Sequence, residues 1–168
     1  MHVQRLIVKD CTAEEAVQLA HPLRLHPSLQ ELGIKDTPLD TPAVLGALVD
    51  AAIGHGLTGF FCSECELGPL AATHLARLLR DAPRLSALLL HIDSLCEAAS
   101  APVLASALRV SSLSVLSLES VRLWHNGMGS TMIDALVGHR TLQQILLSYN
   151  WVFSITLSLA LLVLAWLV

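Results

Sequence analysis

The residues of this chain best suited to chemistry are Cys62 and Cys65, in the segment CSEC. Two thiolates at this spacing supply half of a zinc site, and Cys11 and Cys96 are the conceivable partners for the other half. However, Cys62, Cys65 and Cys11 also fall at fixed positions of a repeat, where packing accounts for them. We therefore expect buried structural thiols, which behave as small hydrophobes, and no metal site.

Histidines are the next candidates for catalysis. His91 lies on a predicted strand two residues before Asp93, and His74 lies on a predicted helix four residues before Leu78. Neither has a serine or cysteine nucleophile placed beside it by a recognisable motif. We expect exposed or capping histidines, a solvated helix face for the charged run over 77–84, and no enzymatic activity.

The elements that position these side chains follow from a 28-residue period. Leu29, Leu57, Leu85 and Leu113 are each 28 residues apart, with further anchors at Val3 and Leu142. A fixed period of this length is typical of a solenoid of stacked supersecondary units. The units start near residues 3, 29, 57, 85, 113 and 142, so the solenoid spans 1–150.

Each unit carries the same pattern of apolar positions. Counted from the anchor, the fourth and sixth positions are apolar or cysteine and the eleventh is apolar. The ninth position is Cys11, Thr37, Cys65, Asp93, Val121 and Asn150. The fourth and sixth positions are Leu6 and Val8, Leu32 and Ile34, Phe60 and Cys62, Leu88 and Leu90, Leu116 and Leu118, Ile145 and Leu147. This matches L-x-x-L-x-L-x-x-N/C-x-L, and the chain resembles leucine-rich-repeat proteins of the ribonuclease-inhibitor-like subfamily.

The local physical chemistry agrees with this pattern. Alternating apolar positions put side chains on one face of a short strand, and spacings such as Leu75 to Leu79 and Leu104 to Leu108 predict a helix that packs back over the strand. Gly33 and Gly56 mark turns or close approaches. The fold class expected is therefore α/β, a leucine-rich-repeat horseshoe of about five repeats, with parallel strands on the concave face and helices on the convex face.

Composition narrows the function classes. Of the 168 residues, 54% are hydrophobic and 14% charged, which is apolar for one soluble domain. The net charge of −4 comes without a basic stripe or aromatic residues among lysines and arginines, so nucleic acid is not an expected partner. Glycine-rich phosphate loops are absent, and we expect no cofactor.

The expected location is cytoplasmic. Neither asparagine, Asn126 or Asn150, begins an N-glycosylation acceptor, and 1–7 lacks the plan of a secretory signal.

The tail over 151–168 is an uncharged apolar segment, WVFSITLSLALLVLAWLV. It is long enough for a membrane-spanning helix, and Trp151 and Trp166 suit interfacial anchoring, so a C-terminal membrane anchor is one expectation. The alternatives are a sixth repeat helix covered by further repeats, or a truncated or misread gene end. Neither terminus has the polar cap that a repeat array needs, which indicates a fragment of a longer array.

A binding site is expected on the strand residues that point away from the core. Stacking places Phe61, Leu89 and Ile92 together as an exposed apolar patch, rimmed by Glu64, His91 and Lys35. Such a patch is typical of a protein-binding surface, and Phe61 is the best candidate for its anchor. An apolar patch that only accommodates crowded strands is the alternative.

The resemblance implies a protein-protein interaction module, part of a larger scaffold or sensor. Two other classes stay open at this point. The chain is also similar in its repeats to the Ran GTPase-activating protein, which implies a regulator of GTP hydrolysis, although no functional residue carries over. A membrane-tethered adaptor is the third class.

Overall fold

A computed structural model describes residues 3–23, 25–67, 70–91, 100–120, 128–137 and 139–147. These residues form six strands and five helices that alternate along the chain. The elements are β1 (Arg5–Lys9), α1 (Ala13–Leu23), β2 (Glu31–Lys35), α2 (Pro42–His55), β3 (Gly59–Ser63), α3 (Ala71–Asp81), β4 (Ala87–His91), α4 (Ser100–Arg109), β5 (Val115–Glu119), α5 (Met128–Leu136) and β6 (Gln144–Leu146).

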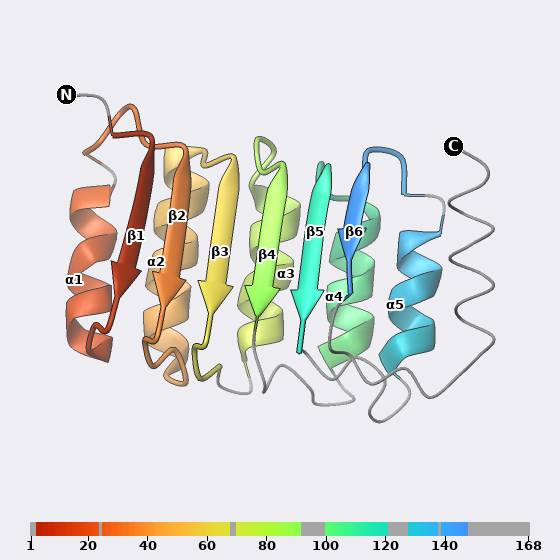
Figure 1. Ribbon diagram of the computed structural model, residues 1–168, viewed down its shortest axis with the longest axis horizontal. Coiled ribbons are helices and arrows are strands. Elements are labelled where there is room, and N and C mark those ends of the chain that lie inside the picture. The colour runs from red at the N-terminus through yellow and green to blue at the C-terminus, as the bar shows by residue number, and fades with distance from the viewer. Residues whose placement is uncertain are drawn as a thin grey trace.

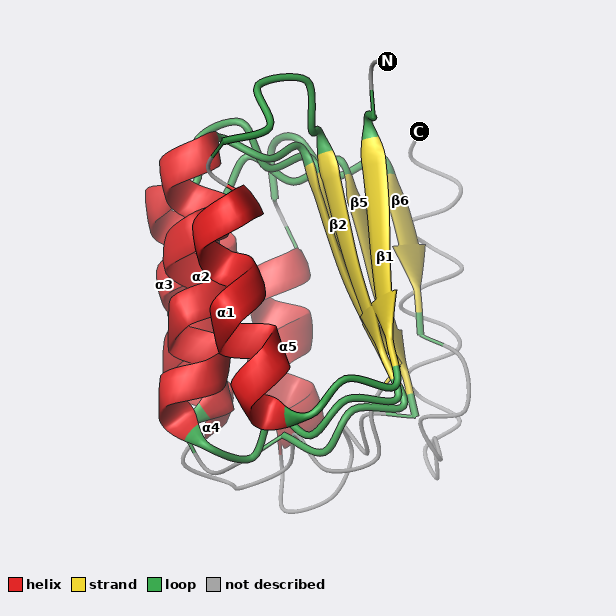
Figure 2. Ribbon diagram, turned by 90° about the vertical axis from the view of Figure 1, so that its left-hand side faces the viewer, coloured by secondary structure: helices red, strands yellow, loops and turns green. Residues whose placement is uncertain are grey.

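The strands form one parallel sheet in chain order, from β1 to β6. Figure 1 shows the strands side by side with the helices behind them, and Figure 2 shows the same two layers edge-on. All five helices of the described residues cover one face of the sheet, and no described helix covers the other face. The predicted unit of strand, turn and helix is confirmed, as is the α/β class.

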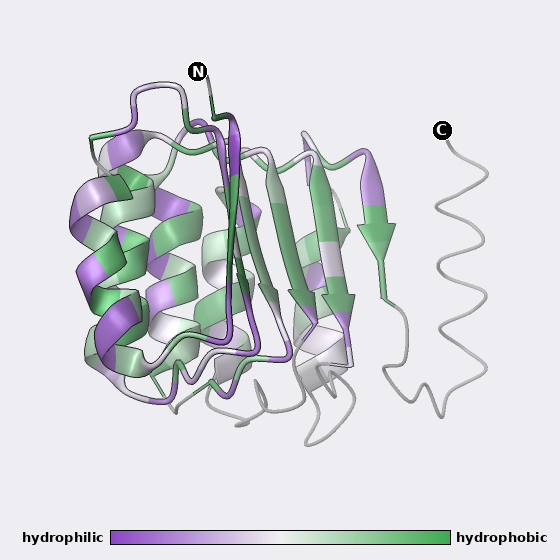
Figure 3. Cartoon of the chain, turned by 60° about the vertical axis from the view of Figure 1, so that its left-hand side comes forward, coloured by the Kyte–Doolittle hydropathy of each residue, from purple (hydrophilic) through white to green (hydrophobic). Residues whose placement is uncertain are grey.

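The core lies between the sheet and the helices. Leu32, Phe60, Leu88 and Leu116 are register partners on β2 to β5, and all four are buried. The same row continues to Leu6 on β1, the partner of Leu32, and to Ile145 on β6, the partner of Leu116, and both are only partly buried. The predicted inward positions are therefore confirmed, with burial complete in the middle of the stack. Figure 3 shows apolar colouring along the middle of the strands and hydrophilic colouring at the ends of β1.

A corner in the left-handed conformation ends most of the strands. The residue directly after the strand has positive φ in four units, namely Asp10 (53°), Asp36 (48°), Glu64 (53°) and Ser120 (56°). The backbone N–H of Glu64 donates to the carbonyl of His91 at 2.9 Å, so the corner also extends the pairing to the next strand. Left-handed backbone costs an L-residue about 1–2 kcal/mol, which these bonds must offset.

Hydroxyl groups connect successive units just before β3, β4 and β5. The side chain of Thr58 donates to the carbonyl of Gln30 at 3.1 Å, Ser86 donates to Thr58 at 3.0 Å, and Ser114 donates to Ser86 at 3.0 Å. Each of these bonds joins residues 28 positions apart. We call this series the hydroxyl ladder, because it repeats once per unit.

The start of α1 and the end of α2 show standard capping. At the start of α1, the Glu15 carboxylate accepts hydrogen bonds from the Thr12 backbone N–H at 2.8 Å and the Thr12 hydroxyl at 2.9 Å. These bonds lower the pKa of Glu15. The Glu15 N–H returns a bond to the Thr12 hydroxyl, forming a capping box. Gly56 ends α2 at φ 73°, as its predicted role in a turn requires.

Two side chains predicted to be solvated pack between α2 and α3 instead. Arg77 Nη2 lies 2.7 Å from the Asp50 carboxylate and donates to the Gly46 carbonyl at 3.3 Å. The His74 ring fills the space over Gly46, where a Cβ would lie 3.0 Å from its Cε1. Burial, followed by the Arg77 charge, lowers the pKa of His74. The expectation is wrong for these two side chains, which are partly buried because the lack of a side chain at Gly46 allows close approach of α3. Arg80, Asp81 and Arg84 of the same charged run are exposed, as predicted.

The tail over 151–168, for which a membrane anchor or a repeat helix was predicted, lies outside the described residues. Among the residues that the structure describes, no helix is long and apolar enough to cross a membrane.

Candidate binding face

The face of the sheet that no described helix covers carries three rows of side chains, one from every second strand position. The central row runs across the strands through Ile7, Gly33, Phe61, Leu89 and Ser117, which are successive register partners. Because strand side chains alternate between faces, this row stands opposite the core. We call this surface the outer face.

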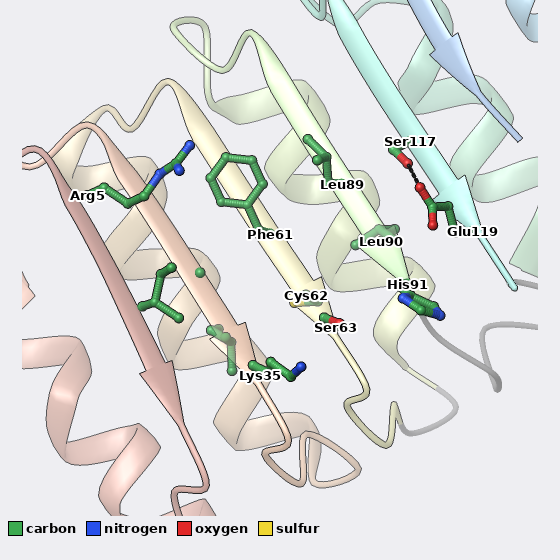
Figure 4. Close-up of a pocket in the computed structure, with 13 residues that line it drawn as sticks. Arg5, Lys35, Phe61, Cys62, Ser63, Leu89, Leu90, His91, Ser117 and Glu119 are labelled. Carbon is green, nitrogen blue, oxygen red and sulfur yellow. Dashed lines mark hydrogen bonds between the residues drawn. The ribbon is translucent and has the colours of Figure 1, made fainter. Parts of the chain in front are cut away.

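A hollow of about 390 Å³ lies on the outer face. It extends across β1 to β5, and Figure 4 shows Phe61 and Leu89 beside it with Lys35, Ser63 and His91 toward the ends of the strands. We call it the apolar hollow. Its lining residues are Arg5, Ile7, Gly33, Ile34, Lys35, Phe61, Cys62, Ser63, Leu89, Leu90, His91, Ser117 and Glu119.

Gly33 makes room in the middle of the central row. Its register partners Ile7 and Phe61 both carry large side chains, whereas Gly33 has none. A Cβ at Gly33 would lie 3.2 Å from Cγ1 of Ile7, so the Ile7 side chain leans over the glycine. Ile7 is nevertheless 61% exposed, the most exposed apolar side chain of this row among the described residues.

Phe61 is held in place by two neighbours, Gly59 and Arg5. Its ring lies over Gly59, where a Cβ would be only 2.9 Å from Cζ of the ring. The guanidinium carbon of Arg5 is 5.4 Å from the ring centroid, within the range of a cation–π interaction, and Arg5 also forms an ion pair with Glu31. The anchor side chain is therefore pre-positioned and only partly exposed.

Polar side chains border the apolar hollow at the carboxyl ends of the strands. Lys35, Ser63, His91 and Glu119 are successive register partners there. The ammonium of Lys35 lies 3.6 Å from the Glu64 carboxylate. On β5, Ser117 donates its hydroxyl hydrogen bond to Glu119 at 3.2 Å.

The structure brings most of the predicted patch together. Phe61 and Leu89 are register partners, and Lys35 and His91 lie in the row beside them, as predicted. Glu64 lies outside the apolar hollow, paired with Lys35. Ile92 lies outside the described residues. Phe61 and Leu89 are half-buried rather than fully exposed, which for Phe61 follows from its packing on Gly59 and Arg5.

Sequence reasoning missed Ile7 and Gly33 as part of the site. Both stand in the same column of the repeat as Phe61 and Leu89, so the signal was present. Recognising the hollow needed the further observation that a glycine lies between two large apolar residues.

Cys62 and Cys65 pack as predicted, whereas Cys11 is only partly buried. Cys62 and Cys65 are both buried, and the Cys65 thiol donates to the Ser63 carbonyl at 3.3 Å, while Cys11 donates in the same way to Lys9 at 3.7 Å. A hydrogen bond between the Cys62 and Cys65 thiols raises the pKa of Cys62 well above its usual value and lowers that of Cys65 to about 7.

Cys96 lies outside the described residues. Within the described ranges, no group of three histidine, cysteine, aspartate or glutamate side chains could hold a metal ion.

No family model matches this chain, and the curated proteins contain no significant match to it. The resemblance to leucine-rich repeats consequently rests on the residues of the chain itself.

Proposed function

We propose that this chain is a leucine-rich-repeat protein of the ribonuclease-inhibitor-like kind, and that it is a protein-protein interaction module without catalytic activity. Support comes from the 28-residue pattern together with strands that stack in chain order at the predicted positions. In this proposal the outer face is the concave surface of the repeat array, and it holds the partner.

The apolar hollow is the observation that carries the proposal. Ile7, Phe61 and Leu89 surround a cavity on a sheet face that no helix of the described residues covers, and polar side chains border the cavity on one side. An apolar centre with a polar rim is the usual anatomy of a protein interface. Aromatic side chains often dominate the binding energy of such an interface, and in this proposal Phe61 is that side chain.

A comparison of binding free energies indicates that the apolar hollow would hold one anchoring side chain of the partner and would not be a complete interface. Burying one aliphatic or aromatic side chain of a partner contributes about 1.5–3 kcal/mol. A micromolar Kd corresponds to about 8 kcal/mol. Most of the remaining free energy must therefore come from contacts along the neighbouring rows of the outer face.

Substituting Phe61 tests the proposal. The tagged full chain and its Phe61→Asp variant would be cross-linked in cells of the native host, and captured proteins quantified by mass spectrometry. A matched control is Val103→Asp, which adds the same charge at a 38% exposed residue of α4 on the helix layer.

We expect at least one partner to be lost with Phe61→Asp and retained with Val103→Asp, while thermal unfolding shows that both variants fold. If the captured set is the same for Phe61→Asp as for the unsubstituted chain, the proposed binding face is wrong.

A further inference from the structure

The charge around the apolar hollow is unevenly distributed. At the amino ends of the strands, Arg5 is paired with Glu31, so this side is neutral. Beyond the carboxyl ends, the chain places carboxylates directly after the lining residues, because Asp36 follows Lys35 and Glu64 follows Ser63. An approaching partner therefore meets a neutral side and an acidic side.

A second hollow, of about 280 Å³, lies at the acidic side and is lined by Asp36, Thr37, Pro38, Glu64 and Glu66. We call it the acidic hollow. The two hollows adjoin, since Lys35 and Ser63 of the first immediately precede Asp36 and Glu64 of the second.

The lysines nearby do not neutralise these carboxylates. Lys9 lies 3.6 Å from Asp10 and 3.8 Å from Asp36, and Lys35 lies 3.6 Å from Glu64. Two lysines thus face the four carboxylates of Asp10, Asp36, Glu64 and Glu66, which leaves a net charge of −2. Glu66 is exposed, and it has no ion pair with any described residue.

From these two adjoining hollows we infer that the partner presents an apolar side chain together with a lysine or arginine a few residues away. The inference rests on the proposed function and specifies the chemistry of its partner. Charge complementarity supports this occupant, because a cation can pair with carboxylates that the chain leaves unbalanced. A second copy of this chain, with net charge −4, or an anionic membrane surface would be repelled at the same place.

The dimensions of the strand set the expected spacing. Glu64 follows Phe61 by three residues, which is about 10 Å of extended chain. A partner segment in extended conformation would cover this distance in about three residues, and long basic side chains add reach. The basic residue should therefore lie two to four positions from the apolar anchor.

Selection from a phage-displayed library of random dodecapeptides tests this inference with the full chain as target. Bound peptides would be sequenced, synthesised and measured by fluorescence anisotropy at low and high salt. We expect enrichment of an aliphatic or aromatic residue with lysine or arginine at the stated spacing, and weaker binding at high salt because charges at an exposed border are screened.

Two sets of variants separate the apolar anchor from the charge. Gly33→Leu and Phe61→Ala alter the apolar hollow, and each should abolish or strongly reduce binding of the selected peptides. The double variant Glu64→Lys with Glu66→Lys reverses two charges of the acidic hollow. It should weaken the binding of the selected peptides about tenfold, as expected for the loss of two exposed charge pairs. Asp81→Lys with Asp134→Lys makes the same change in charge on α3 and α5, and should leave binding unchanged.

The outcomes distinguish the inference from the function on which it rests. Selected peptides that need Gly33 and Phe61 but carry no basic residue would overturn the inference of a basic partner. Peptides that bind the Glu64→Lys, Glu66→Lys chain as well as the unsubstituted chain would overturn it too. Both outcomes would leave the proposed binding face intact. Peptides insensitive to both Gly33→Leu and Phe61→Ala overturn the proposed face and the inference together, and so does a library from which nothing is enriched.

Discussion

At the scale of the residue, the conformation of Phe61 depends on the missing side chain at Gly59. A Cβ at this position would lie 2.9 Å from Cζ of the ring and 3.1 Å from Cγ of Glu31. Both neighbours are the far parts of side chains, so they can move without disturbing the backbone. Gly59 therefore controls where the ring of Phe61 points.

We predict that Gly59→Ala moves the Phe61 ring and leaves the protein folded. Loss of the packing place over Gly59 should separate the ring from Arg5, while stability changes by less than about 1 kcal/mol. Aromatic NMR resonances of Phe61 report the movement, and urea unfolding reports stability. The control is Gly54→Ala in α2, where a Cβ meets no atom within 4 Å and the ring should not move. Unchanged Phe61 resonances in the Gly59→Ala protein would contradict the prediction.

The candidate site could be predicted only in part, because its shape depends on side-chain contacts such as that of Phe61 with Gly59. The position of Phe61 and Leu89 side by side follows from counting in the repeat, because register in a parallel stack is fixed by the period. The hollow beside them depends on how Ile7 leans over Gly33, and on how Arg5 and Gly59 hold a ring. These are rotamer choices set by contacts between units, which a single pattern of apolar positions does not encode.

At the scale of the element, the corner after each strand imposes a conformation that glutamate disfavours. Glu64 has φ 53°, whereas asparagine and aspartate adopt the left-handed region several-fold more readily than other side chains. Its ion pair with Lys35 is 3.6 Å long and exposed, so it contributes little to stability. Relief of the backbone cost should outweigh the loss of this pair.

We predict that Glu64→Asn raises the free energy of unfolding by about 0.5 kcal/mol. This value is the backbone cost of the left-handed conformation that asparagine relieves, minus the small stabilisation lost with the exposed ion pair to Lys35. Urea denaturation at neutral pH measures the change. Glu66→Asn is the control, because it removes the same charge from the acidic hollow at a residue without positive φ. Equal effects of the two substitutions would mean that charge repulsion, and not the corner, is responsible.

The elements themselves were largely predictable. The alternation at Leu88 and Leu90 and the helical spacing of Leu75 and Leu79 place β4 and α3 where they are found. The corners at Glu64 and Ser120 were not predictable, because neither glutamate nor serine favours positive φ, whereas Asp10 and Asp36 are of a type that adopts it more readily. The pairing of Arg77 with Asp50 was also missed, since it requires the closeness of α2 and α3 at Gly46.

At the scale of the whole molecule, interactions run between neighbours in sequence. In the described part of the chain, each strand pairs only with the strands of adjacent units, and the principal helix contacts likewise join α1 to α2, α2 to α3, α3 to α4 and α4 to α5. A stack of this kind has a stability that is close to a sum over units and interfaces. An interior unit has two interfaces and the β1 unit has one in this structure.

We predict from this arrangement a gradient of amide hydrogen exchange along the sheet. Amides of β3 and β4 should exchange slowest, and those of β1 should exchange much faster, because opening the β1 unit breaks only one interface. Exchange measured by mass spectrometry on the intact chain gives the order. Equal protection of β1 and β4 would show that the stack opens as a single cooperative block.

The hydroxyl ladder has a consequence for how the length of this chain can change. Thr58, Ser86 and Ser114 present the same chemistry at the same place in three successive units, so each rung fits the one before it equally well. Duplicating or deleting a whole 28-residue unit would leave a matching donor and carbonyl at the new junction. Inserting a single residue would instead remove the rung and turn the following strand side chains to the wrong face of the sheet. The chain is therefore built to gain or lose length in whole units.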